Sequence, residues 1–189
     1  PSLFGSTAVL ADLGAAGRLA MMLMIIDRIA GILFFPAIAR SSTGAQLTTA
    51  VVRGHLLYLG MLGIALASSI IYPHYWVVLL GSQYKDLEPF LWMVFLASLF
   101  MKGAEFCFRT MAARGHTTYQ AGTIPAVLAV QVAYLALFGV ADLKAVLGFS
   151  VVGSFVHFFY QYWLLAARMY KGTYGYLPQA GGPTVDDKA

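Results

Sequence analysis

A long run of apolar residues, positions 19 to 39, lies between Arg18 and Arg40 of this 189-residue chain. A helix of about 20 apolar residues is long enough to cross a lipid bilayer. Asp27 and Arg28 nevertheless stand next to each other near the middle of the run. Because a charge at that depth costs about 2.5–3.5 kcal/mol to insert, each side chain needs a partner, water or a cavity that offsets the cost.

The composition of the whole chain is that of a membrane protein. Apolar residues make up 60% of the sequence and charged residues 11%, whereas soluble domains carry about 45–50% and about 25%. This excludes a soluble domain with a single anchor and predicts an integral membrane protein. The net charge is +4, but the basic residues are spread between the apolar runs, so no nucleic-acid partner is expected.

Five apolar segments have the length of spanning helices, about 17 to 25 residues. The predicted spans are residues 19–39, 49–72, 89–111, 120–140 and 143–168. Only helices and closed barrels cross a bilayer, and these segments lack the alternation of barrel strands. We therefore predict an all-α integral membrane protein with a transmembrane domain over residues 1–172.

Two further segments are predicted outside the spans. Pro73 ends the second span, and residues 75–81 form an apolar, aromatic stretch that is too short to cross the bilayer. Because Tyr and Trp favour the membrane–water interface, we predict a short interfacial helix there. Residues 173–189 are rich in Gly, Pro and Asp, which predicts a flexible cytoplasmic tail.

The charges between the spans predict an orientation. An excess of basic residues follows the odd-numbered spans: Arg40, Arg53, Arg109, Arg114, Arg168 and Lys171. The segments after the second and fourth spans are acidic or neutral. Since cytoplasmic loops carry the excess of Lys and Arg, the N-terminus of this chain is predicted outside and the C-terminus in the cytoplasm.

Three stretches carry a resemblance to a known family. The first span ends in "FFPAIAR", and the second is followed by "YPHYWVVLLGSQYKDLEPFLWMV", with Gly81 and Tyr84 at a glycine and a tyrosine position of the family signature. The third span ends in "RTMAARGHTTYQA". In these features the chain resembles the polysaccharide and oligosaccharide lipid flippases of the MOP (MATE-like) exporter superfamily.

The resemblance implies a fold and a function. Such proteins have twelve helices in two six-helix lobes, so the five spans would be the eighth to twelfth, most of the second lobe. The chain begins at Pro1, and we expect it to be the C-terminal part of a transporter whose N-terminal lobe is a missing partner. The expected activity is translocation of a lipid-linked oligosaccharide of the undecaprenyl-pyrophosphate type across the bacterial inner membrane, for surface polysaccharide biosynthesis.

The ionisable residues inside the spans are the main candidates for a substrate-binding cavity. Arg28 could face such a cavity and bind phosphate oxygens bidentately, or Asp27 and Arg28 could each link to a neighbouring helix. Lys102, Glu105 and Arg109 share one face of the third span at i, i+3 and i+7. Glu105 could neutralise both basic neighbours, or the face could form a path for substrate or protons.

Five secondary candidates have a structural interpretation beside the functional one. Arg18 and Arg53 lie near span ends, from which their side chains can reach the interface. Gln131, His157 and Gln161 lie on the last two spans and are typical of hydrogen bonds between helices.

No catalytic motif, phosphate loop or metal-ligand spacing occurs in the sequence. We therefore predict neither enzymatic activity nor a cofactor. Three alternatives stay open at this point: a MATE-like drug/cation antiporter, a membrane-embedded glycan transferase or polymerase, and a nonfunctional truncated product. The short loops disfavour the transferase, which normally carries catalytic acids or histidines in large polar loops.

Overall fold

The computed structural model describes residues 7–41, 45–140 and 142–170. Within these ranges the chain is helical and contains no strand, which confirms the all-α prediction. The helices are α1 (Thr7–Met22), α2 (Met24–Arg40), α3 (Ala45–Ile71), α4 (Pro73–Leu80), α5 (Leu91–Ala112), α6 (Thr123–Phe138) and α7 (Leu143–Tyr170), with 3₁₀ segments η1 (Ser82–Phe90) and η2 (Gln120–Gly122).

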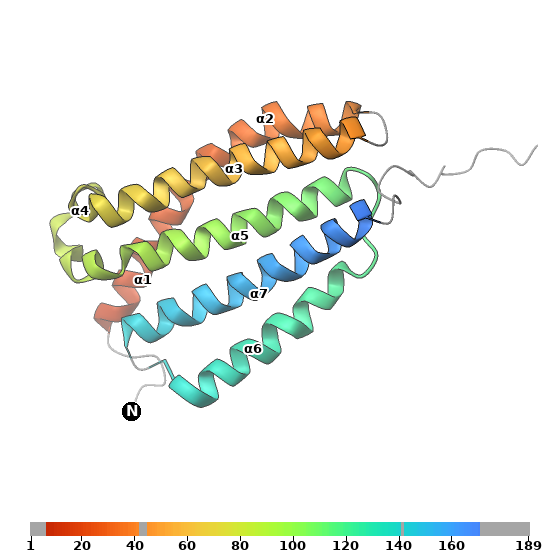
Figure 1. Cartoon of the computed structure of the whole chain (residues 1–189). Coiled ribbons are helices and arrows are strands. Elements are labelled where there is room, and N and C mark those ends of the chain that lie inside the picture. The colour runs from red at the N-terminus through yellow and green to blue at the C-terminus, as the bar shows by residue number, and fades with distance from the viewer. Residues whose placement is uncertain (1–6, 42–44, 141, 171–189) are drawn as a thin grey trace, which may run out of the picture.

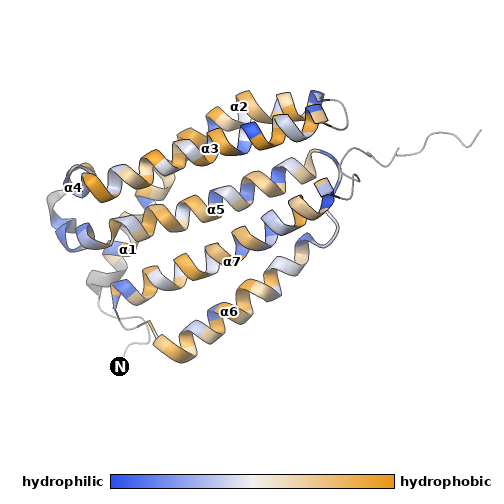
Figure 2. Cartoon of the chain, viewed as in Figure 1, coloured by the Kyte–Doolittle hydropathy of each residue, from blue (hydrophilic) through white to orange (hydrophobic). Residues whose placement is uncertain are grey.

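Five helical stretches in this part of the chain are long and apolar enough to cross a membrane. They are Ala11–Arg40, Ala45–Ile71, Gln83–Ala112, Gln120–Phe138 and Leu143–Tyr170. Figure 2 shows hydrophobic residues along the whole length of these helices. The chain is therefore a multi-pass membrane protein in its helical architecture, as the sequence predicts.

The long helices lie side by side in the order α2, α3, α5, α7 and α6 (Figure 1), and α1 crosses the bundle at one end. α5 occupies the centre, where it packs mainly on α7 and α3. Its small and apolar side chains are accordingly the most buried of any helix, Ala104, Phe106 and Cys107 among them. α2 and α6 lie at the two edges, and each packs mainly on one neighbour.

The first spanning stretch is longer than the sequence predicts and is interrupted. Helical structure begins at Thr7, and Ala15, Ala16 and Leu19 of α1 are buried against the rest of the bundle. A break at Leu23 separates α1 from α2, and the Ile26 amide donates to the Leu23 carbonyl across it. The alanines and leucines of this segment favour a helix, and the burial of Ala15, Ala16 and Leu19 stabilises it further, so the helix continues through Gly14 and Gly17.

The short helix predicted at residues 75–81 corresponds to α4. Pro73 occupies its first turn, where the missing amide is not needed for a helical hydrogen bond. Gly81 ends it with φ of 116°, a conformation that glycine adopts at no steric cost. The location of α4 at the membrane surface stays a prediction, and the predicted tail at 173–189 lies outside the described residues.

The C-terminal ends of α2, α5 and α7 lie together at one end of the bundle (Figure 1). This end carries Arg40, Arg114 and Arg168. We expect single cysteines at Gln83 and Lys144, in a Cys107→Ser background, to react with an impermeant maleimide added to intact cells. A cysteine at Thr117 is expected to react only after lysis, because the excess of basic residues predicts that this end lies in the cytoplasm. The opposite labelling pattern would reverse the orientation.

Candidate functional site

A polar cluster in the interior of the bundle joins three helices. Asp27 of α2 accepts hydrogen bonds from the Tyr58 hydroxyl of α3, on one carboxylate oxygen, and from the Lys102 ammonium of α5, on the other. The Asp27 side chain is only 13% exposed. Its charge is therefore offset by a cation and a hydroxyl donor from two neighbouring helices, which lowers the cost of burying it.

The same cluster continues along α5. The Lys102 ammonium lies 3.4 Å from a Glu105 carboxylate oxygen, and Arg109 binds the other oxygen of that carboxylate. Glu105 thus bridges both basic residues, as their spacing predicts. With two carboxylates and two basic side chains, Asp27, Lys102, Glu105 and Arg109 form a neutral set, and we call these four residues with Tyr58 the charge cluster.

A small void lies beside the charge cluster. Its volume is about 10 Å³, which is about the space of one water molecule. Phe35 and Phe106 close it on the apolar side, and the Arg109 guanidinium lies 5.9 Å from the centroid of the Phe35 ring. The void is much too small for an organic substrate. In this conformation Lys102 bridges Asp27 and Glu105, and the void beside them has no space for a substrate.

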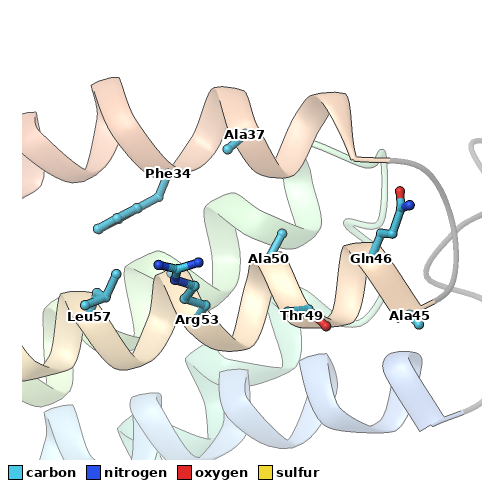
Figure 3. A pocket seen from close by; sticks show the side chains of 9 residues that line it. Phe34, Ala37, Ala45, Gln46, Thr49, Ala50, Arg53 and Leu57 are labelled. Atoms are coloured by element: carbon cyan, nitrogen blue, oxygen red, sulfur yellow. The ribbon is translucent and has the colours of Figure 1, made fainter.

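A much larger cavity, of about 660 Å³, opens between α2 and α3 (Figure 3). We call it the α2–α3 groove. Its walls are Phe34, Ala37, Ala45, Gln46, Thr49, Ala50, Arg53, Gly54 and Leu57. A methyl group placed on Gly54 would meet Phe106 Cζ at 3.5 Å and Phe34 Cβ at 3.6 Å, which are ordinary contact distances, so the backbone of α3 lies close to both aromatic side chains at this position. Binding pockets for organic ligands commonly measure about 300–1,000 Å³ and are mostly apolar.

Arg53 is the charged residue of this groove. Figure 3 shows its guanidinium rising from α3 toward α2, between Phe34 and Ala50. Arg53 is exposed and makes no ion pair or hydrogen bond with any residue that the structure describes. The groove thus combines an apolar wall with one available guanidinium, a group that binds phosphate oxygens in a fork geometry.

The remaining predicted residues are spread over the bundle. Arg18 and Arg28 are exposed, and within the described ranges neither has an ion-pair partner. The side chain of Gln131 on α6 lies directly over Gly153 of α7 and would have to shift if that residue carried a side chain. They do not form part of either site.

His157 and Gln161 occupy the same face of α7 without a contact to the charge cluster. His157 is half-buried. Gln161 is buried, and its side-chain oxygen has no hydrogen-bond partner in the described part of the chain. The hydrogen bonds between helices that the sequence suggests for these two residues are therefore not seen.

Two polar residues of the structure were not singled out in the sequence as site residues. Tyr58 is 2% exposed, and in the sequence it has the features of an ordinary aromatic core residue. In the structure its hydroxyl donates a hydrogen bond to Asp27. Arg114 is 6% exposed and donates to the carbonyl oxygens of Ile38, at 3.0 Å, and Ser41. Its position in a loop gave no sign that it holds the end of α2.

Comparisons of this chain with protein-family models, with curated proteins and with solved structures found no match. The functional argument therefore rests on the two sites themselves. Among the described residues, no three His, Cys, Asp or Glu side chains come close enough together to hold a metal ion.

Proposed function

We propose that this chain is part of a membrane transporter that translocates a lipid-linked oligosaccharide, with the α2–α3 groove as the place where its lipid phosphate binds. The observation that carries the proposal is Arg53, an available cation in the wall of a largely apolar groove between two spanning helices. An ionisable residue within a membrane span is costly to bury and is by default a candidate for a substrate or ion pathway.

The chemistry of the groove suits an anionic amphiphile. Phe34, Ala50 and Leu57 offer an apolar surface to an isoprenoid chain. Arg53 offers two parallel N–H donors to a phosphate at the end of that chain. Gln46 and Thr49 supply further polar groups along the wall. A lipid diphosphate is the class of molecule that uses all of these features together.

A drug/cation antiporter is the second candidate function, and the charge cluster is the feature that argues against it. A cationic substrate needs a carboxylate that is available to it. Asp27 is bound by Lys102 and Tyr58, and Glu105 by Lys102 and Arg109. Because both carboxylates are neutralised within the protein, the available charge in the groove is positive, and we favour the anionic substrate.

The proposal extends to the setting of the protein. The basic end of the bundle would face the cytoplasm, and the membrane would be a bacterial inner membrane. The N-terminal lobe of the transporter and the surrounding lipids would be its partners. α4 would lie at the outer surface, between the second and third spans.

A binding experiment with farnesyl diphosphate tests the groove. We expect the chain in lipid nanodiscs to bind this probe, and Arg53→Met to weaken binding about ten- to hundredfold, since a hydrogen bond to a charged group contributes about 1.5–3 kcal/mol. Arg53→Lys should retain part of the affinity because it keeps the charge without the fork. Ala50→Phe should also weaken binding, because it fills the groove and leaves Arg53 in place.

The controls separate the charge from the apolar surface. Arg40→Met removes one exposed positive charge outside the groove and should leave the affinity unchanged. Farnesol, which lacks the diphosphate, should bind the parent and Arg53→Met equally. Equal binding of farnesyl diphosphate by the parent and Arg53→Met would refute the proposed role of the groove.

A further inference from the structure

α2 is the most loosely packed of the spanning helices that form the two sites. Only two of its residues, Ala30 and Ile38, are buried. The break at Leu23 separates it from α1, and Pro36 lies inside it. A proline removes one helical hydrogen bond and gives a helix a point at which it can bend. The segment between these two points is therefore held mainly by specific contacts.

The same helix forms one wall of the α2–α3 groove. Phe34 and Ala37 belong to α2, and the facing residues Ala50, Gly54 and Leu57 belong to α3. Any movement of α2 away from α3 widens the groove. The position of α2 consequently determines what the groove can hold.

Two polar links fix α2 to its neighbours. At its C-terminal end, Arg114 donates to the carbonyl oxygens of Ile38 and Ser41. Near its N-terminal end, Asp27 binds Lys102 of α5 and Tyr58 of α3. Both links involve a charged side chain that is mostly or fully buried, where ion pairs and charged hydrogen bonds are little screened by salt.

Lys102 has two carboxylates within reach. It binds Asp27 across the helix interface, and it lies 3.4 Å from Glu105 on its own helix. It can therefore release Asp27 and still be paired with Glu105. Asp27 is then left with the Tyr58 hydroxyl of α3 as its one remaining partner among the described residues, a single hydrogen bond from a neutral donor. The exchange keeps Lys102 paired and leaves Asp27 one hydroxyl donor, so its cost is lower than that of breaking an isolated buried pair, in which both charges lose their partners.

We propose that the Asp27–Lys102 ion pair is a latch that positions α2 and sets the width of the α2–α3 groove. With the pair formed, α2 is held against α3 and α5, as in this structure. With Lys102 turned to Glu105, α2 loses its ion pair to α5, and the Tyr58 hydroxyl alone does not hold Asp27. The segment of α2 between Leu23 and Pro36 then moves away from α3. The inference rests on the proposed function only in taking the groove as the binding site, and Asp27 and Lys102 are positioning residues.

Among the described residues, Glu105 is the charged side chain that competes with Asp27 for Lys102. Arg28 is the neighbour of Asp27 on α2 and makes no contact with the cluster, and α3 contributes Tyr58. α5 contributes Glu105 and Arg109. From α7, no described side chain is hydrogen-bonded or ion-paired to the cluster.

The experiment measures the separation of α2 and α3 directly. Spin labels at Ile32 and Leu56, both exposed, are introduced as cysteines into a Cys107→Ser background in nanodiscs without ligand. Dipolar broadening between the labels reports how close the helices are. We expect Asp27→Asn and Lys102→Met each to cause a loss of broadening, because either substitution removes the latch.

Three further variants make the result specific. Glu105→Gln removes the second partner of Lys102, so the latch should stay closed and the broadening should be retained. Asp27→Asn combined with Lys102→Met should show the loss of either single variant and no more, since both act on one pair. This double variant leaves the Glu105–Arg109 pair intact and also tests the latch if Lys102→Met alone folds poorly.

Labels at Val132 and Phe155, exposed positions on α6 and α7, serve as the control pair and should not change in any variant. The latch is refuted if Lys102→Met keeps the broadening of the parent protein. It is equally refuted if the control pair loses broadening together with the α2–α3 pair, because the effect is then a general loosening. No lipid diphosphate is used, so this result is independent of the binding test of the proposed function.

Discussion

Replacing Arg114 with methionine is expected to destabilise the folded protein by about 3 kcal/mol. Arg114 is buried and donates two hydrogen bonds to the carbonyl groups at the end of α2, those of Ile38 and Ser41. A hydrogen bond to a charged group contributes about 1.5–3 kcal/mol. A cation at a helix C-terminus adds a favourable interaction with the partial negative charge there. Methionine keeps the apolar contacts of the side chain and removes these terms.

The measurement is unfolding by sodium dodecyl sulfate in mixed micelles, followed by far-UV circular dichroism. Both hydrogen bonds of Arg114 come from one guanidinium nitrogen, Nη2. Arg114→Lys should therefore recover part of the loss, because its single ammonium nitrogen keeps the charge and can donate to a carbonyl group. Arg40→Met is the matched control. It removes the same charge from an exposed site on the same helix end and should change stability by less than about 0.5 kcal/mol. Similar stabilities for Arg114→Met and Arg40→Met would show that α2 is held by other contacts.

The sequence predicts the architecture because the bilayer leaves few choices. A chain with 60% apolar residues in five long segments can satisfy its backbone inside a membrane only as helices. The sequence also predicts that Glu105 bridges Lys102 and Arg109, since residues three or four positions apart on a helix are neighbours on its surface. Both predictions depend only on local spacing along the chain.

What the sequence did not predict depends on which helices become neighbours. Lys102 and Asp27 are separated by 75 positions, and Arg114 and Ile38 by 76. No periodicity identifies such pairs. The start of α1 at Thr7 could likewise not be predicted from the sequence. It is stabilised by the burial of Ala15 and Leu19 against helices that come later in the chain. The sequence shows that Asp27 needs a partner but not which residue it is, and the structure identifies Lys102.

Asp27 and Arg28 are adjacent in the sequence, but the structure places their side chains in different environments. Asp27 points into the bundle and its charge is offset by Lys102. Arg28 is exposed and has no hydrogen-bond or ion-pair partner within the described residues. A cation at this depth that the protein does not neutralise must be offset by water or by an anion from outside the bundle. Arg28 is therefore the more informative residue of the two for transport.

In the complete transporter that we propose, Arg28→Met is expected to lower the rate of lipid-diphosphate translocation by about ten- to hundredfold. Arg28 lies outside the α2–α3 groove, so the contact we expect it to make is with the phosphate during its passage, and its loss removes one charged hydrogen bond of about 1.5–3 kcal/mol. The variant should insert and fold normally, because removing a mid-membrane charge makes insertion easier and leaves no carboxylate without its partner. Arg28→Lys keeps the charge without the fork and should be partly active.

Translocation is measured in proteoliposomes with a fluorescent lipid diphosphate that a membrane-impermeant reagent quenches only in the outer leaflet. Ile29→Met is the control, since it introduces the same side chain at the next exposed position and should leave the rate unchanged. A poorly folded Arg28→Met protein would mean that Arg28 neutralises a buried carboxylate after all. A stable Arg28→Met protein with the full translocation rate would mean that water alone offsets the charge, and that Arg28 does not contact the substrate.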